Sequence, residues 1–323
     1  MFYAPACNKW RLCPTIADMK NSLCMIASFL TGAVISLMVV ANTRLGSATT
    51  NEVSMIVNQA IGVVLTTVIL VAGRKSTLIN PPRRPSRWYM YFGGLFGVVV
   101  MICNFYSVLG VGATMAMAAA VFGQSLMGLL MDLFGLFGMQ KRKTGGKKWI
   151  SVAVSFAGIL MMVPASESPA GLAYILLGIL AGIVTMIQLS YNSSFARAKG
   201  AVYSARQNAL SGLLGTVIYS FLLMPDATCA GFARLPEVPL MTAALGGVLA
   251  IVVVCSTNLI IPKIPALYSS LLLSTGQILA SIVLDAVMYD IFSPMLLAGA
   301  IVMLAGIALS FLFERSQRPV ADR

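Results

Sequence analysis

Ten apolar stretches, each long enough to cross a bilayer, occupy most of this 323-residue chain. A transmembrane helix needs about 20 apolar residues to cross about 30 Å of hydrocarbon. We therefore expect an all-α integral membrane protein with ten transmembrane helices and no separate soluble domain. The stretches span 22–42, 53–73, 88–108, 112–133, 148–165, 171–191, 203–224, 240–260, 265–287 and 294–313.

The positive charges fall in alternate gaps between these stretches. Twenty of the 22 Lys and Arg residues lie in one set of gaps and at the two ends of the chain, whereas the other set holds only Arg44 and Arg234. Because Lys and Arg are retained on the cytoplasmic side during insertion, both termini are expected in the cytoplasm. A miscounted helix would scramble the alternation, so the charges independently favour ten spans.

Composition narrows the possible functions further. A mean hydropathy of +0.89 with only 10% charged residues excludes a soluble globular domain. The net charge of +12 is scattered over short loops, which indicates topology setting and attraction to anionic lipid rather than nucleic-acid binding. The absence of histidine excludes an imidazole metal site and a Ser-His triad. We expect no enzyme, no metal and no cofactor.

The chain contains an internal duplication. Matching residues recur in order along five consecutive stretches at offsets of 150, 153 and 148, and the offset changes within loops. The pairs are Gly32 with Gly182, Asn42 with Asn192, Asn58 with Asn208, Gly62 with Gly212, Thr66 with Thr216, Gly93-Gly94 with Gly246-Gly247, Gly123-Gln124 with Gly276-Gln277, Asp132 with Asp285, and Ala157-Gly158 with Ala305-Gly306. We divide the chain into an N-terminal cytoplasmic segment 1–21, repeats 22–165 and 171–313, and a cytoplasmic tail 314–323.

An odd number of spans in each repeat has a topological consequence. If the first repeat starts in the cytoplasm, the second starts outside, so the two repeats are inverted and related by a pseudo-two-fold axis in the membrane plane. Inverted repeats give many secondary transporters two mirror-related states, one open to each side of the membrane. This is the main physical argument for transport.

Particular motifs resemble a known family. The segment Asn58-Gln-Ala-Ile-Gly62, the run Gly110-Val-Gly-Ala-Thr114, and Gly123-Gln124 followed by Met131-Asp132-Leu-Phe-Gly-Leu-Phe-Gly138 are similar to the YdcZ-type inner-membrane exporters. Those are bacterial five-span members of the drug/metabolite transporter superfamily. The resemblance implies a multi-pass protein of the bacterial plasma (inner) membrane, with a ten-helix fold and a central cavity between its halves. It does not imply a substrate.

Polar side chains at depth are the candidate substrate ligands. Gln124 and Gln277 lie near the midplane as a pseudo-symmetric pair, and each follows a glycine that permits close approach. Asn104 and Asn258 lie deeper along their helices, with Tyr106 and Tyr268 nearby, and Gln188 and Asn192 share one face of helix 171–191 and its extension. For each of these, hydrogen bonding between helices is an equally good interpretation.

Two carboxylates lie near helix ends, where the helix dipole disfavours negative charge. We expect cationic partners from the opposite repeat: Arg44 for Asp285 and Arg197 for Asp132. These would be ion pairs that break when a gate opens, and simple anchoring at the membrane interface is the alternative.

The leading hypothesis is a secondary transporter, in the exporter direction, for a small polar or amphipathic metabolite moved by alternating access between the repeats. A channel or facilitator and a non-transporting membrane scaffold are the alternatives. Helices 22–42 and 171–191 carry no acidic residue, which argues against a cation-drug antiporter of the small multidrug type. The expected partners are a small-molecule substrate and the lipid bilayer, not nucleic acid, with the chain acting as a monomer or a homodimer.

Overall fold

The computed structural model describes residues 16–77, 79–82, 84–134, 147–162, 169–260, 266–288 and 294–316, and every regular element in these ranges is a helix. The long helices are α1 (Ile16–Ala48), α2 (Asn51–Ala72), α3 (Gly94–Phe134), α4 (Lys147–Met162), α5 (Pro169–Lys199), α6 (Ala201–Leu223), α8 (Leu240–Ile260), α9 (Ala266–Met288) and α10 (Pro294–Ser316). Three short elements complete the set: η1 (Trp88–Phe92), α7 (Pro225–Arg234) and η3 (Leu235–Glu237). The expected all-helical class is confirmed.

Helix ends follow local chemistry. The Thr50 hydroxyl accepts a hydrogen bond from the Val53 N–H at 3.5 Å, and Glu52 lies in the first turn of α2, where the dipole favours negative charge. Gly200 joins α5 to α6 at φ +96°, a conformation that residues with a Cβ rarely adopt. Pro225 starts α7, which turns 110° away from α6.

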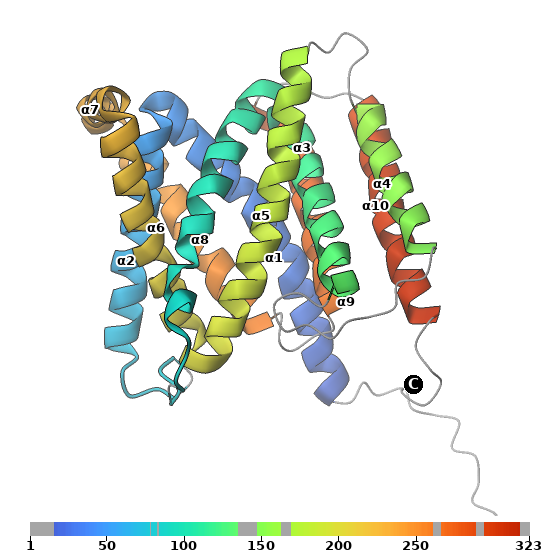
Figure 1. Cartoon of the computed structure of the whole chain (residues 1–323), viewed down its shortest axis with the longest axis horizontal. Helices are drawn as coiled ribbons and strands as arrows, with labels where there is room; N and C mark the ends of the chain where they lie inside the picture. The colour runs from blue at the N-terminus through green and yellow to red at the C-terminus, as the bar shows by residue number, and fades with distance from the viewer. Residues whose placement is uncertain are drawn as a thin grey trace, which may run out of the picture.

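The helix α3 contains a sharp bend at one residue. Gly112 has φ +78° and ψ 168°, which interrupts the helix and leaves a rising arm 94–111 and a descending arm 113–134 (Figure 1). The sequence predicted two spans, 88–108 and 112–133, separated by a short gap. The two arms are present, but the break is a single glycine, and residues 88–92 form the 3-10 helix η1 rather than the start of the α-helix.

The two repeats run in opposite directions. In Figure 1, α1 begins at the lower end of the molecule, whereas its counterpart α5 begins at the upper end. Helix packing is exchanged in the same way: α1 packs against α9 and α8, and α5 packs against α3. The helices α2 and α6 pack against each other, as do α4 and α10, so each meets its own counterpart.

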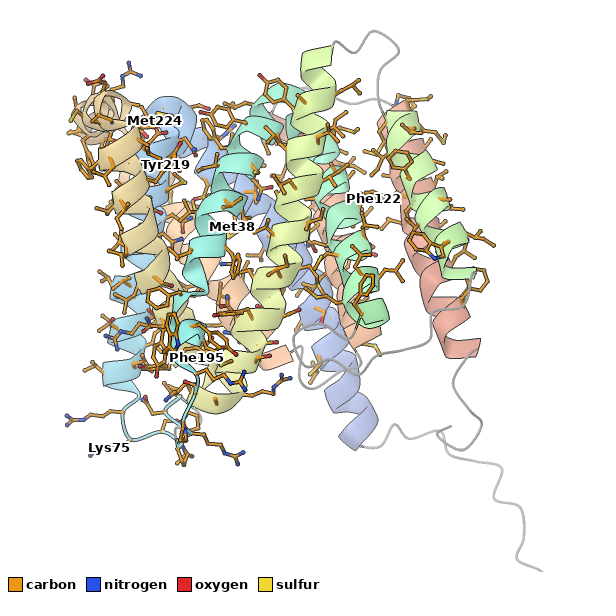
Figure 2. The ribbon with its side chains drawn as sticks, in the orientation of Figure 1. Met38, Lys75, Phe122, Phe195, Tyr219 and Met224 are labelled. Carbon is orange, nitrogen blue, oxygen red and sulfur yellow. The ribbon has the colours of Figure 1, made fainter. Side chains whose placement is uncertain are left out.

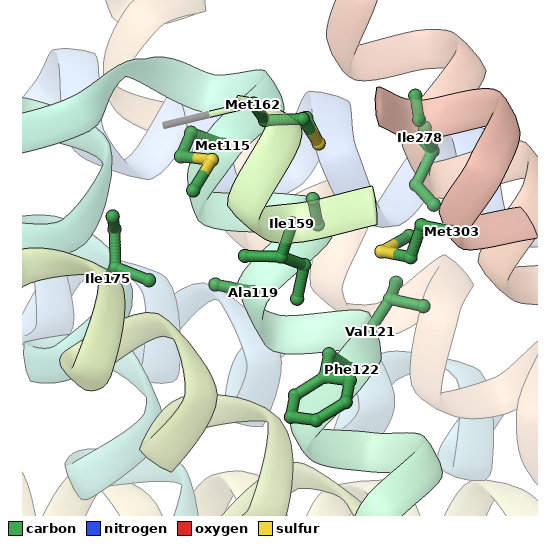
Figure 3. Packing of buried hydrophobic residues seen from close by; sticks show 11 residues of the cluster. Met115, Ala119, Val121, Phe122, Ile159, Met162, Ile175, Ile278 and Met303 are labelled. Atoms are coloured by element: carbon green, nitrogen blue, oxygen red, sulfur yellow. The ribbon is translucent and has the colours of Figure 1, made fainter. Parts of the chain in front are cut away.

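An apolar core fills the space beside the descending arm of α3. Met115, Val121 and Phe122 of that arm contact a cluster that includes Ile159 of α4 and Met303 of α10 (Figure 3). Large apolar side chains also cover the outer surface, such as Val64 at 60%, Leu222 at 73% and Val287 at 78% exposed. Water would penalise such a surface, whereas lipid does not.

Within the described residues, five helices are long and apolar enough to cross a membrane, or six if the bent pair α6 and α7 forms one span. One of the five is the bent stretch Trp88–Met131, and three further apolar helices are shorter: Trp149–Met162, Leu272–Val287 and Leu297–Gly306. The count of ten spans and the cytoplasmic position of both termini stay predictions.

Candidate functional site

The repeats meet at glycines that occur in exchanged pairs. A Cβ on Gly276 of α9 would collide with the Phe29 carbonyl oxygen of α1, and a Cβ on Gly123 of α3 would collide with the Ile179 carbonyl oxygen of α5. The partners Phe29 and Ile179 are themselves related by the repeat offset of 150. The same helix crossing is therefore built twice, with backbone against backbone where no side chain intervenes.

Asparagine pairs are repeated in the same way. Asn58 donates to the Asn42 side chain at 2.8 Å, and Asn192 donates to the Asn208 side chain at 2.9 Å. Each pair faces a glycine of the opposite repeat, because a Cβ on Gly93 would lie 2.6 Å from the Asn192 Oδ1 and a Cβ on Gly246 would lie even closer to the Asn42 Oδ1. Each hydrogen bond joins two helices of one repeat, and each pair packs on a glycine of the other repeat.

Two glutamine side chains lie beside only one of these pairs. The Gln188 Nε2 donates to the Asn208 Oδ1 at 3.0 Å and to the Gly93 carbonyl at 3.5 Å. The Gln59 side chain of α2 is 7% exposed, and among the described residues its Nε2 reaches only the Met101 sulfur, at 4.0 Å. A Cβ on Gly97 would lie 3.0 Å from the Gln188 Nε2 and 3.7 Å from the Gln59 Nε2, so the two amides converge on α3 from opposite repeats.

The remaining predicted amides lie at other positions. Asn104 of α3 has a buried Oδ1 without a partner among the described residues, and the nearby Tyr106 is 40% exposed. Asn258 donates to the Ala201 carbonyl at 3.2 Å, which joins α8 to the start of α6. The Tyr268 side chain lies outside the described residues.

The predicted midplane glutamines lie at the two glycine crossings rather than in the amide group. Gln277 is 1% exposed, and its backbone carbonyl accepts a hydrogen bond from the Ser36 hydroxyl at 2.6 Å. Gln124, at the equivalent crossing of α3 and α5, is half-buried. A role for either side chain in substrate binding stays a prediction.

Asp285 contacts backbone rather than a cation. Its carboxylate, 3% exposed, accepts hydrogen bonds from the N–H groups of Ala113 at 3.0 Å and Thr114 at 2.6 Å. These groups are the first free donors of the descending arm of α3, because the bend at Gly112 removes their helical partners. Asp285 is thus an N-cap supplied by the opposite repeat.

The other members of the two expected ion pairs are placed differently. Arg44 is exposed, and the part of the chain that the structure describes contains no ion pair between it and Asp285. The Arg197 guanidinium donates to the Ser194 hydroxyl at 3.0 Å on its own helix. The Asp132 side chain lies outside the described residues, so its expected pairing with Arg197 stays a prediction.

Aromatic side chains gather at one end of the molecule. Phe195 lies at the lower end in Figure 2, near the loop that carries Lys75. Its ring is 4.9 Å from Tyr91 of η1, and Tyr191 of α5 lies 5.7 Å from Phe96 of α3 and donates a hydrogen bond to the Tyr89 carbonyl. We call Tyr89, Tyr91, Phe96, Tyr191 and Phe195 the aromatic closure. It joins α5 of the second repeat to η1 and α3 of the first.

The rim of the aromatic closure is cationic. The Lys199 ammonium lies 5.8 Å from the centre of the Tyr91 ring. The Arg87 guanidinium donates to the Tyr89 hydroxyl at 3.1 Å, and this hydrogen bond raises the pKa of Arg87. The described residues contain no group of three or more Cys, Asp and Glu side chains able to hold a metal ion.

The arrangement of two antiparallel repeats agrees with a comparison of the sequence with known families. The family described as "Putative inner membrane exporter, YdcZ" matches residues 23–161 and, a second time, residues 173–309. The chain belongs to this family. The resemblance seen in the sequence is confirmed, and so is the fused two-repeat form, which places this YdcZ-family protein in the inner membrane.

A solved structure shows the same fold. A protein described only as "Crystal structure of protein" superposes with a TM-score of 0.59 at 16% sequence identity, covering 93% of this chain and 99% of its own. At that identity the likeness concerns the fold alone. No curated protein matches the chain.

Sequence reasoning about this YdcZ-family chain missed Gln59, the aromatic closure and the backbone hydrogen bonds of Asp285. Gln59 lies inside the family-like segment 58–62, but its counterpart in the second repeat is Ala209, so the search for repeated residues passed over it. The contacts of Asp285 join residues 171 and 172 positions apart, which no local pattern reports. The bend at Gly112 was signalled in the sequence by the two glycines of the segment Gly110-Val-Gly-Ala-Thr114.

Proposed function

We propose that this protein is a secondary transporter that exports a small polar or amphipathic metabolite by alternating access between its inverted repeats. The exchanged glycine crossings at Gly123 and Gly276 are the main support. Because equivalent contacts are built from both repeats, each repeat can adopt the arrangement of the other, and the exchange opens the opposite side of the membrane. Exporter direction is taken from the family description.

The unequal ends of the repeat interface indicate which state this structure resembles. The aromatic closure lies at the end where the cations of the predicted cytoplasmic loops gather. The positions that correspond to Tyr191, Phe195 and Tyr91 in the other repeat hold Ala41, Leu45 and Ala244. We assign the structure to the state closed toward the cytoplasm, and opening that side requires Tyr191 to release the Tyr89 carbonyl.

The substrate path lies between the repeats in this proposal, where Gln188, Asn192 and Asn104 supply polar groups inside an apolar bundle. Both halves of the path belong to one chain, so a single copy is sufficient for transport, and a homodimer would join two complete units.

Transport is tested in proteoliposomes that contain the purified chain. A panel of labelled metabolites is assayed for counterflow, with each unlabelled metabolite loaded inside, and with and without a pH gradient. Saturable counterflow, with accumulation above equilibrium, is the expected result for alternating access. Flux that grows linearly with concentration indicates a channel, and no flux of any solute that binds the protein contradicts the proposal.

A further inference from the structure

The two glutamines beside α3 break the symmetry of the repeats. Gln59 corresponds to Ala209 and Gln188 to Met38, so neither amide has a counterpart across the pseudo-two-fold axis. Both side chains nevertheless reach the same point next to Gly97. The two equivalent positions of the duplicated fold therefore differ: one carries two amide side chains, and the other carries Met38 and Ala209.

The two glutamines differ in which of their polar atoms have hydrogen-bond partners. Both N–H groups of Gln188 are directed at oxygens, the Asn208 Oδ1 and the Gly93 carbonyl, whereas its Oε1 accepts nothing from a described residue. The Gln59 Oε1 likewise has no donor in the described part of the chain, and its amide nitrogen has only a thioether. A weak N–H···S contact does not satisfy a buried amide.

The same face of α3 continues this set of free acceptors. Gly97, Met101 and Asn104 are spaced i, i+4 and i+7, so they lie in one row along the helix. Met101 contacts Gln59, and one turn further the buried Asn104 Oδ1 has no partner among the described residues. We call Gln59, Gln188 and Asn104 the amide site. Its three side-chain carbonyl oxygens can each accept a hydrogen bond from a ligand.

No charged side chain in the described part of the chain bonds to the amide site. The nearest charges along α2 and α6 are Glu52, seven positions before Gln59, and Arg206, six positions before Gly212, which packs on Gln59. The Arg206 Nε is buried without a partner among the described residues, but no hydrogen bond joins it to the amide site. The free groups of the site itself are uncharged amide oxygens, so an ion that contacts them loses its hydration without a full opposite charge in hydrogen-bond contact, which disfavours charged ligands.

The pseudo-symmetric position of the two glutamines is apolar, whereas Asn104 corresponds to the buried Thr257, whose hydroxyl donates to the Val253 and Val254 carbonyls of its own helix. Residues Met38, Ala209, Ala250 and Val254 correspond to Gln188, Gln59, Gly97 and Met101. None of the four has a polar side-chain group able to donate a hydrogen bond, so this position suits an apolar part of a ligand.

We infer that the amide site is the polar half of the substrate site and binds the uncharged, hydrogen-bond-donating end of an amphipathic solute, such as a carboxamide or an alcohol. The apolar remainder of the solute lies toward Met38 and Ala209. This inference rests on the proposed transport function and adds to it the class and the orientation of the substrate.

Three probes with one apolar body test the inference. Phenylacetamide, phenylacetate and 2-phenylethylammonium differ at the polar end, which is neutral, anionic or cationic. Binding of each radiolabelled probe is measured on the purified protein in nanodiscs. Wild type is expected to bind phenylacetamide at least tenfold more tightly than either ion.

The variants use residues that the fold already holds at the equivalent positions. Gln59→Ala copies residue 209 and Gln188→Met copies residue 38. The double variant is expected to lose at least fivefold in phenylacetamide affinity, because it lacks the two glutamine carbonyl oxygens that accept hydrogen bonds from the N–H groups of the probe. Val64→Ala, on the exposed face of α2, is the matched control and should bind like wild type.

The outcomes separate the site from the transport function. Tighter binding of an ion, no binding of phenylacetamide by wild type, or a loss below fivefold in the double variant overturns the amide site. A charged solute that accumulates in proteoliposomes equally with wild type and double variant leaves transport standing and rejects the site. Gln59-dependent binding without flux of any solute rejects transport and retains the site.

Discussion

Replacing Asp285 with alanine should destabilise the protein through the bend of α3. The carboxylate accepts two hydrogen bonds from buried N–H groups, at 3.0 and 2.6 Å. A hydrogen bond to a charged group contributes about 1.5–3 kcal/mol, and loss of an N-cap costs about 0.5–2 kcal/mol. Since Ala113 and Thr114 are buried inside the protein, their freed N–H groups gain no water, and we expect a loss of about 3 kcal/mol in the free energy of unfolding.

Two further substitutions make this prediction specific. Asp285→Asn keeps one acceptor oxygen and should lose about half as much. Asp226→Ala is the control, because this aspartate also lies in the first turn of a helix, α7, but is exposed, where such changes stay within about 0.5 kcal/mol. Unfolding in mixed micelles titrated with sodium dodecyl sulfate, followed by tryptophan fluorescence, gives the three values.

Hydrogen exchange locates the effect. In Asp285→Ala, the amides of Ala113 and Thr114 should exchange faster than in wild type, whereas amides early in α2 should not change. A destabilisation below about 1 kcal/mol, or unchanged exchange at these two amides, would refute the reasoning that Asp285 caps the descending arm.

Three other predictions concern separate features. Gly276→Ala should destabilise by about 1–3 kcal/mol through overpacking against the Phe29 carbonyl, while Gly128→Ala, whose new Cβ would meet only a Met186 methyl at 3.7 Å, should be neutral in the same titration. Tyr191→Phe removes the hydrogen bond to the Tyr89 carbonyl and should raise labelling, by a cytoplasmic probe, of cysteines placed between the aromatic closure and the middle of the membrane; unchanged labelling would contradict its gating role. In a variant that keeps only the exposed Cys229, an impermeant maleimide should label intact spheroplasts from outside, and labelling only after lysis would contradict the predicted topology.

Helical content and the duplication could be predicted from the sequence because both are written in local or periodic patterns. Runs of apolar residues predicted the positions of the helices, and the offset of 150 predicted that Asn42 and Asn192 occupy equivalent places. The structure gives each of them the same kind of partner, Asn58 and Asn208. The family resemblance rested on equally local motifs.

Local and periodic patterns could not predict contacts between residues that are far apart in the sequence. Dipole reasoning indicated a partner for Asp285 and offered only cations as candidates, whereas the structure shows free backbone donors at a bend. A backbone N–H carries no residue-specific signal, so it cannot be predicted as a ligand until the bend is known. Gln59 was missed because its importance lies in having no repeated counterpart, which a search for repetition rejects.

The exchanged glycine crossings have an evolutionary consequence. In a transporter assembled from two identical subunits, any substitution alters both crossings equally and leaves the balance between the two orientations unchanged. In this fused chain, the crossing at Gly276 can be weakened while that at Gly123 is untouched. A difference of about 1.4 kcal/mol between them shifts the ratio of inward-open to outward-open molecules tenfold, so one point mutation could retune the resting orientation without touching a ligand.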